Sequence, residues 1–133
     1  MIRNRAQAAQ LKRFDGLRWG RISPTDVDLF VEFGNRLFVV GECKYRNAQV
    51  PTGQRLGMER IVDAVTLPPH RYAALLILAH NTEDGDIDYA QTEVTRYRWL
   101  GEWKKPRREI VLVDAIDRLR RFVEHSCRLR LVA

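Results

Sequence analysis

The sequence predicts an α/β (α+β) fold in which helices flank a central mixed β-sheet. The chain has 133 residues, 45% of them hydrophobic, which matches one ordinary domain with a single core. Hydrophobic spacing switches between helical and strand periods in the order helix, two or three strands, helix, strand, strand, helix. No linker, repeat or low-complexity tract interrupts this order, so we expect residues 1–133 to form a single domain.

The first third of the chain predicts one helix followed by a hairpin. Helix formers fill Ile2 to Phe14, and a stretch with two glycines and a Ser-Pro pair follows as a turn region. The period then changes to two over Val27 to Phe33, where apolar residues at odd positions alternate with Asp28, Phe30 and Glu32. Gly34-Asn35 supplies turn chemistry, and Leu37 to Val40 resumes a β-rich run. The pattern indicates a β-hairpin.

The middle of the chain predicts a helix and a buried strand. Met58, Ile61, Val62 and Val65 have the i, i+3, i+4, i+7 spacing of an amphipathic helix, which should end before the prolines at 68 and 69. The continuously apolar run 72–79 is typical of a strand covered on both faces. The polar stretch 81–88 then predicts a loop.

The last third predicts a strand and a long helix. Residues 92–100 are rich in Thr, Val, Tyr and Trp, which favours a strand that turns near Gly101. Asp114 is expected to cap a final helix, and Ile116, Leu119 and Val123 should face the core.

The charge distribution favours an anionic partner. The net charge is +6; basic residues dominate residues 1–21 and 92–133, whereas acids outnumber them between 22 and 91. Basic flanks around an acidic centre suit a protein that neutralises phosphates and holds a cation, although basic surfaces also occur on proteins that bind nothing anionic. Charge alone leaves two interpretations equally open: nucleic acid, DNA first, as the partner, or no anionic partner at all. Candidate phosphate contacts are Arg46, Arg55, Arg60, Lys104, Lys105, Arg107 and Arg108.

Cysteine usage and hydropathy predict a cytoplasmic protein. Cys43 and Cys127 show no CxxC spacing and are too few for a disulfide framework, so both are interpreted as packing residues in a reducing compartment. The segment Met1 to Arg13 is too polar for a signal peptide, and no apolar run is long enough to span a bilayer. No membrane partner is expected.

The predicted hairpin builds a candidate site. If the turn is centred on Asn35, Asp28 lies opposite Glu42, and Lys44 projects from the same face of its strand as Glu42. Two converging carboxylates suit a hard cation such as Mg²⁺, and Lys44 can position or activate a water molecule. A shift of one pair would put Asp26 in place of Asp28. The alternative is a solvated hairpin face, but Glu42 follows an apolar run typical of a central strand, where unpaired charge is costly.

A second set of residues repeats this spacing. Asp86, Asp88, Glu102 and Lys104 are placed as Asp26, Asp28, Glu42 and Lys44 are, including a glycine before the Glu. The second set would need a turn near Thr95, where the residues are β-forming and contain no turn former. We therefore assign it to solvated loop and turn.

The segments Thr25-Asp26-Val27-Asp28 and Gly41-Glu42-Cys43-Lys44 resemble the PD-(D/E)XK nuclease superfamily. The resemblance covers about residues 1–80 in element order and implies a restriction endonuclease-like fold. It also implies that Asp28, Glu42 and the Cys43 carbonyl bind Mg²⁺ or Mn²⁺ and that Lys44 assists the nucleophilic water. Gln54 is similar to a glutamine that several branches place beside the active site. Many relatives add an acid from the first helix, but Ile2 to Phe14 has none, which gives no support for a second metal.

The expected function is therefore metal-dependent hydrolysis of phosphodiester bonds, by an endonuclease or exonuclease that leaves a 5′-phosphate, as the resemblance implies. Two alternatives remain open: a nucleic-acid-binding module that does not cut, and a structural or assembly protein of a mobile element. A chain this small has little room for a separate specificity domain. Structure-selective cutting or a homodimer would suit it.

Overall fold

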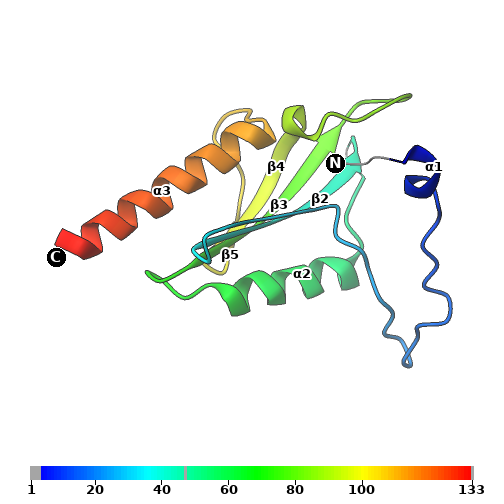
Figure 1. The fold of residues 1–133 in the computed structure, drawn as a ribbon, viewed down its shortest axis with the longest axis horizontal. Helices are drawn as coiled ribbons and strands as arrows, with labels where there is room; N and C mark the ends of the chain where they lie inside the picture. Colours follow the sequence, from blue (N-terminus) through cyan, green and yellow to red (C-terminus); the bar gives the residue numbers. More distant parts are fainter. Residues whose placement is uncertain (1–3, 47, 133) are drawn as a thin grey trace.

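The computed structural model describes residues 4–46 and 48–132, which form a five-stranded sheet with helices on both faces (Figure 1). The elements, in chain order, are α1 (Arg5–Ala8), β1 (Leu29–Phe33), β2 (Leu37–Tyr45), α2 (Thr52–Val65), β3 (Tyr72–His80), the 3₁₀-helix η1 (Tyr89–Gln91), β4 (Glu93–Trp99), β5 (Glu102–Lys104) and α3 (Leu112–Val132).

The sheet is mixed, as the sequence predicts. Its strand order is β1-β2-β3-β4-β5, with β2 and β3 parallel and every other neighbouring pair antiparallel. A parallel pair needs a long crossover connection, and α2 provides it between β2 and β3. β2 and β3 each have a neighbouring strand on both sides, so they are interior strands. Because they are parallel, their carboxyl ends lie at the same end of the sheet.

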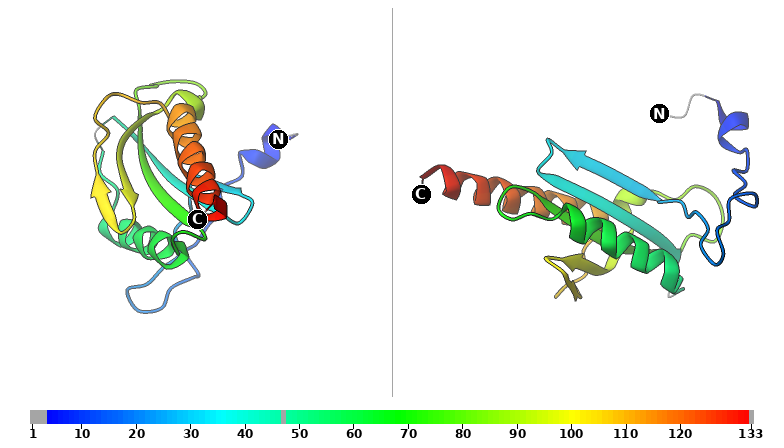
Figure 2. Two further views of the ribbon diagram at one scale, coloured as in Figure 1. Left: turned by 90° about the vertical axis from the view of Figure 1, so that its left-hand side faces the viewer. Right: turned by 90° about the horizontal axis from the view of Figure 1, so that it is seen from below.

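The two larger helices lie on opposite faces of the sheet (Figure 2). Alternate residues of β2 belong to separate cores: Leu37 and Val39 pack with the cluster that includes α3, whereas Val40 packs with the α2 residues Met58 and Val62. This alternation follows from the period of two along a strand. Even-numbered residues of β2 accordingly face α2.

The hairpin has the predicted register. Pairs run from Phe33 with Leu37 to Leu29 with Gly41. Gly34 and Asn35 both have positive φ angles, 55° and 60°, as tight hairpin turns require. Continuing this register by one pair places Asp28, just before β1, opposite Glu42.

The first predicted helix is mostly wrong. Within residues 4–14 of the expected helix, only Arg5–Ala8 is helical. Positions 1–3 lie outside the described residues. The apolar side chains meant to stabilise it find no partner surface: Leu11 is 91% exposed. A short helix without tertiary packing is marginal in water, which explains why this segment runs irregularly toward β1.

Three smaller predictions need correction. Ile61 is 54% exposed, because only the narrower stripe of Met58 and Val62 is buried against the sheet. The last helix begins at Leu112, so Asp114 lies in its first turn rather than at its cap. Glu102 belongs to the edge strand β5 rather than to a turn. Among the described residues, no helix has the length and apolar character needed to cross a membrane.

Candidate active site

Glu42 is a charged side chain inside the sheet. It lies in the carboxyl-terminal half of β2, between β1 and β3, and is only 3% exposed. The amide Nε2 of Gln54, in the first turns of α2, donates a hydrogen bond to Glu42 Oε1 at 3.0 Å. Lys44 Nζ lies 3.5 Å from the same oxygen. The predicted trio of Glu42, Lys44 and Gln54 is therefore assembled on the α2 face.

The second carboxylate oxygen of Glu42 has no partner. Oε2 is buried and makes no hydrogen bond to any described residue. Leaving a buried charged oxygen unsatisfied is costly, and such exceptions in folded proteins call for an explanation. The arrangement has the capacity for one more electropositive contact at Oε2.

Asp28 is held against the same strand. Its Oδ2 accepts a hydrogen bond from the backbone N–H of Cys43 at 2.8 Å, at a point of β2 that lies beyond the first residue of β1 and is not paired with that strand. The N–H and C=O of one strand residue point to the same side, so the Cys43 carbonyl is also directed toward Asp28. Asp26 contributes its backbone carbonyl, 3.4 Å from Gln54 Nε2. The structure thus places the carboxylate of Asp28 beside β2 at Cys43, close enough to Glu42 for its charge to act on that carboxyl.

The electrostatics disfavour charge on Glu42. Burial raises the pKa of its carboxyl, and the nearby charge of Asp28 raises it further, whereas Lys44 and Gln54 oppose the shift. Two carboxylates are therefore held close together with only partial compensation. A bound cation would relieve both effects.

Tyr89 was missed by the sequence analysis. It lies in η1, and its hydroxyl interacts with the Cys43 thiol; burial, followed by the charge of Asp28, raises the Tyr89 pKa to about 12. Burial likewise raises the pKa of Cys43. Both groups stay protonated at neutral pH. Nothing in the loop sequence marks Tyr89, because its proximity arises only from the fold.

The raised pKa of Glu42 leads to a prediction about stability. A carboxyl whose pKa is higher in the folded chain stabilises the fold fully below its unfolded pKa, and this contribution is lost as the pH rises through the folded pKa. We expect Glu42→Gln to unfold at a higher temperature than the unaltered chain at pH 7.5 in EDTA. The difference should shrink toward pH 4. Circular dichroism melts measure it.

The matched control for this measurement is Glu102→Gln. Glu102 is exposed in β5, so its replacement should shift the melting temperature little at either pH. If the difference in melting temperature between Glu42→Gln and the unaltered chain does not change with pH, burial of the Glu42 charge is not the cause of that difference.

The repeated motif does not form a second site. β4 runs from Glu93 to Trp99 without a turn at Thr95, so no hairpin brings Asp86 or Asp88 opposite Glu102. Asp88 instead accepts a hydrogen bond from the N–H of Ala90 and caps η1. The prediction that the acids of the repeated motif are solvated is confirmed, because Asp86, Asp88 and Glu102 are exposed. Glu102 and Lys104 nevertheless lie in the short strand β5.

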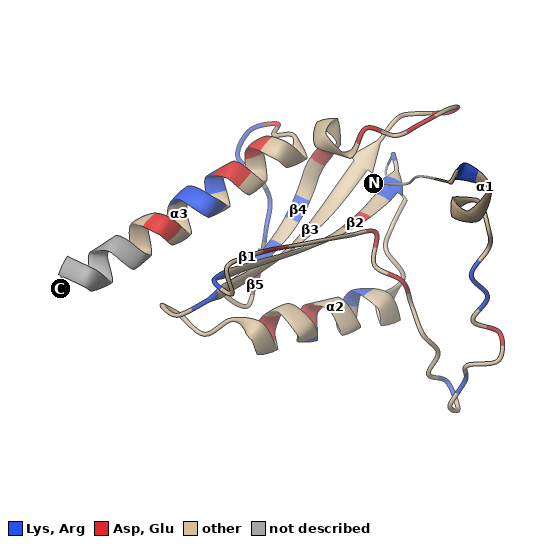
Figure 3. Ribbon diagram, in the orientation of Figure 1, with Lys and Arg blue, Asp and Glu red and all other residues tan. Residues whose placement is uncertain are grey.

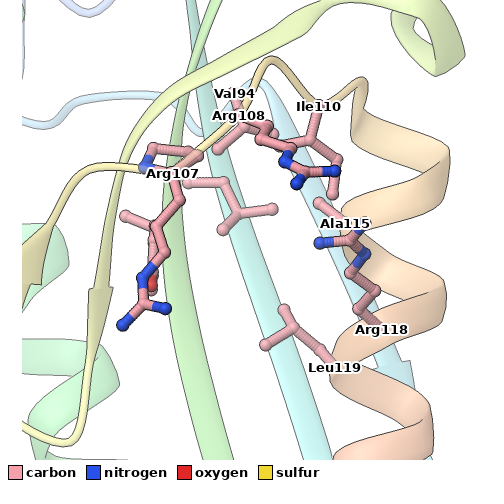
Figure 4. Close-up of a pocket in the computed structure, with 10 residues that line it drawn as sticks. Val94, Arg107, Arg108, Ile110, Ala115, Arg118 and Leu119 are labelled. Atoms are coloured by element: carbon pink, nitrogen blue, oxygen red, sulfur yellow. The ribbon is translucent and has the colours of Figure 1, made fainter.

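The candidate phosphate-contacting residues divide between the two faces of the sheet. Figure 3 shows basic residues on the connection from β5 to α3 and acidic ones on the loop after β3. Arg107 and Arg108, in that connection, line a cavity of about 640 Å³ together with Arg118 of α3 (Figure 4). This cavity lies on the α3 face, whereas Glu42 and Lys44 face α2. The cluster of Lys104, Lys105, Arg107 and Arg108 is therefore separate from the candidate site.

The other three candidate arginines follow β2 or lie in α2. Arg46 follows β2 and pairs with Glu83 at 2.7 Å. Arg55, in α2, has its Nε 3.8 Å from Glu59. Arg60 is an exposed residue farther along α2. Cys43 is a free, half-buried thiol, as predicted for a packing residue; the side chain of Cys127 lies outside the described part of the structure.

The donor set fits a hard divalent cation better than a structural zinc ion. Within the described residues, no three His, Cys, Asp or Glu side chains are grouped so as to hold a metal. Two carboxylates and a backbone carbonyl fall short of a structural zinc site, which takes four ligands. They match Mg²⁺, which is commonly held by one or two carboxylates and keeps several waters. The unpartnered Oε2 of Glu42 is the observation that fits such an ion.

Comparison of the chain with protein-family models, curated proteins and solved structures gave no match.

Proposed function

We propose that the chain is a Mg²⁺- or Mn²⁺-dependent nuclease with a restriction endonuclease-like fold. One observation carries the proposal: a carboxylate of Glu42, buried and with Oε2 unpartnered, beside Asp28 and Lys44. A purely structural role gives no reason to keep this arrangement, because an apolar residue at position 42 would avoid its cost.

The proposed roles follow from where each group lies. Glu42, Asp28 and the Cys43 carbonyl would hold the ion. When bound, the ion supplies Lewis-acid stabilisation of charge on the phosphate oxygens. Gln54 is a positioning residue, since its hydrogen bond fixes the orientation of Glu42. Lys44, about a quarter exposed, is the group that both touches Glu42 and reaches solvent.

Lys44 therefore has two tasks in the proposed reaction. Its ammonium orients the attacking water by a hydrogen bond and offsets negative charge on the phosphate. The water oxygen bonds to phosphorus, the bond from phosphorus to the 3′ oxygen breaks, and the strand is left with a 5′-phosphate. The water releases its proton to solvent, and the departing 3′ oxygen takes one up.

Cleavage assays test the proposal directly. Purified protein is incubated with labelled single-stranded, duplex, flapped and four-way DNA and with matched RNA, each in Mg²⁺, Mn²⁺ or EDTA. We expect products with 5′-phosphates in Mg²⁺ or Mn²⁺ and none in EDTA. Salt-sensitive binding without cleavage of any substrate would instead indicate the non-cutting binding module, and neither binding nor cleavage would favour a structural protein.

A further inference from the structure

Another cavity, distinct from the one beside α3, lies on the same face of the sheet as Glu42 and is polar. Its volume is about 480 Å³, and it lies between the start of α2, the loop after β2 and the strands β3 and β4. Three arginines line it: Arg46, Arg55 and Arg96. No carboxylate is among the described residues that line it. A cavity with this composition is suited to an anion.

A β-bulge makes the cavity more polar than a regular strand would allow. Between β3 and β4, Ile77 pairs with Arg96 and Leu78 with Val94, so Thr95 is the extra residue. Thr95 and Arg96 both line the cavity, although successive residues of a regular strand face opposite sides. Bulges of this kind often redirect side chains beside functional sites.

The strand pairing places the cavity close to the candidate active site. Glu42 pairs with Ile77, and Ile77 pairs with Arg96, so the three residues form one row across the sheet. Neighbouring strands are about 4.8 Å apart, which puts the backbones of Glu42 and Arg96 roughly 10 Å apart. That separation is on the order of the spacing between nearby phosphates of one strand, whose axial rise is roughly 3.4 Å per nucleotide.

The arginines of this cavity are incompletely paired. Within the described residues, Arg96 has no carboxylate partner; its guanidinium lies over the Trp103 ring, 4.7 Å from the ring centroid. The Nε of Arg55 is buried and makes no hydrogen bond in the described structure. Arg46 forms a close ion pair with the exposed Glu83 at 2.7 Å, and Arg55 forms a longer one with Glu59 at 3.8 Å. Stacking of Arg96 on Trp103 orders a guanidinium whose N–H donors are left for a ligand.

We propose that this cavity binds a second phosphodiester of the nucleic acid strand, a few nucleotides from the one at Glu42 and Lys44. The inference rests on the proposed function for its substrate class, but it concerns binding rather than cutting. Arg96 is the central contact, since its guanidinium can donate two parallel hydrogen bonds to a phosphate. Contact at a second phosphate would fix how the strand lies across the active site.

The test measures binding in EDTA, so that it does not depend on cleavage. Fluorescence anisotropy with a labelled 12-nucleotide single strand compares the unaltered chain with Arg96→Gln at several salt concentrations. We expect roughly tenfold weaker binding for Arg96→Gln. The slope of log affinity against log salt should fall by about 0.7, the value for one phosphate contact on a single strand.

Arg36→Gln is the matched control. Arg36 is exposed in the hairpin turn at the opposite end of β2 and carries the same charge, so its replacement should leave the slope unchanged. Equal losses in the two variants would show a general charge effect and overturn the proposal. If Arg96→Gln does not fold, Arg46→Gln takes its place, since that side chain is exposed.

Changes in NMR amide chemical shifts on addition of the same oligonucleotide show where it binds. Changes at Thr52, Thr95 and Arg96 support the cavity, whereas changes confined to residues 104–108 would overturn it. If the protein cleaves no substrate but these chemical-shift changes are still observed, the proposed nuclease activity is refuted and the proposed phosphate-binding site is retained. Absence of salt-sensitive binding by the unaltered chain would refute the site.

Discussion

Glu42→Gln is expected to lower the single-turnover cleavage rate by roughly 10³-fold or more. The substitution keeps the size of the side chain and an oxygen for Gln54, but it removes the negative charge that would hold the metal ion. A loss of several kcal/mol in transition-state stabilisation corresponds to a factor of this order. The rate is measured with protein in excess over a labelled substrate that the unaltered chain cuts.

The repeated motif supplies the control. Glu102→Gln makes the same chemical change at the equivalent position of the second motif and should cut at nearly the normal rate. If Glu102→Gln were inactive and Glu42→Gln active, the assignment of the site would have to be reversed. Normal cutting by both would remove the metal site altogether.

Lys44→Ala is expected to reduce cleavage by about 10²- to 10⁴-fold, the range typical of a group that assists proton transfer or positions a nucleophile. Lys44→Ala should still bind nucleic acid in EDTA in a salt-sensitive way, because most of the phosphate-neutralising charges remain. The comparison of single-turnover rate with affinity for the same DNA measures this separation.

Lys104→Ala is the parallel control, since Lys104 holds the equivalent place in the second motif and is exposed in β5. It should cut normally at saturating protein. A loss of affinity in Lys44→Ala that accounts for its whole loss of rate would limit Lys44 to binding.

Local patterns were enough to predict the part of the fold that carries the site. The turn chemistry of Gly34-Asn35 determined the hairpin register, and that register put Asp28 beside β2. The apolar run before Glu42 correctly indicated an interior strand. These features depend on residues within a short stretch of chain, so period and turn type are sufficient to predict them.

The remainder depends on tertiary contacts that no local pattern records. Whether residues 10–14 form a helix is decided by whether Leu11 finds a surface, and it does not. Tyr89 reaches Cys43 only because β3 brings its following loop back over β2. In the sequence, Arg96 is indistinguishable from any other charged residue of a strand. Its place in the cavity depends on a bulge at Thr95, which no sequence pattern predicts.

The burial of Glu42 sets stability against activity at one position. Most neutral side chains of suitable size would fit the interior of β2 more favourably than a carboxylate with an unpartnered oxygen. Mutations selected only for folding would therefore tend to replace this residue. If Glu42 holds the metal ion as proposed, selection for activity opposes that loss at position 42. The exposed Glu102 experiences no such conflict, so its persistence in a lineage would carry far less information about function.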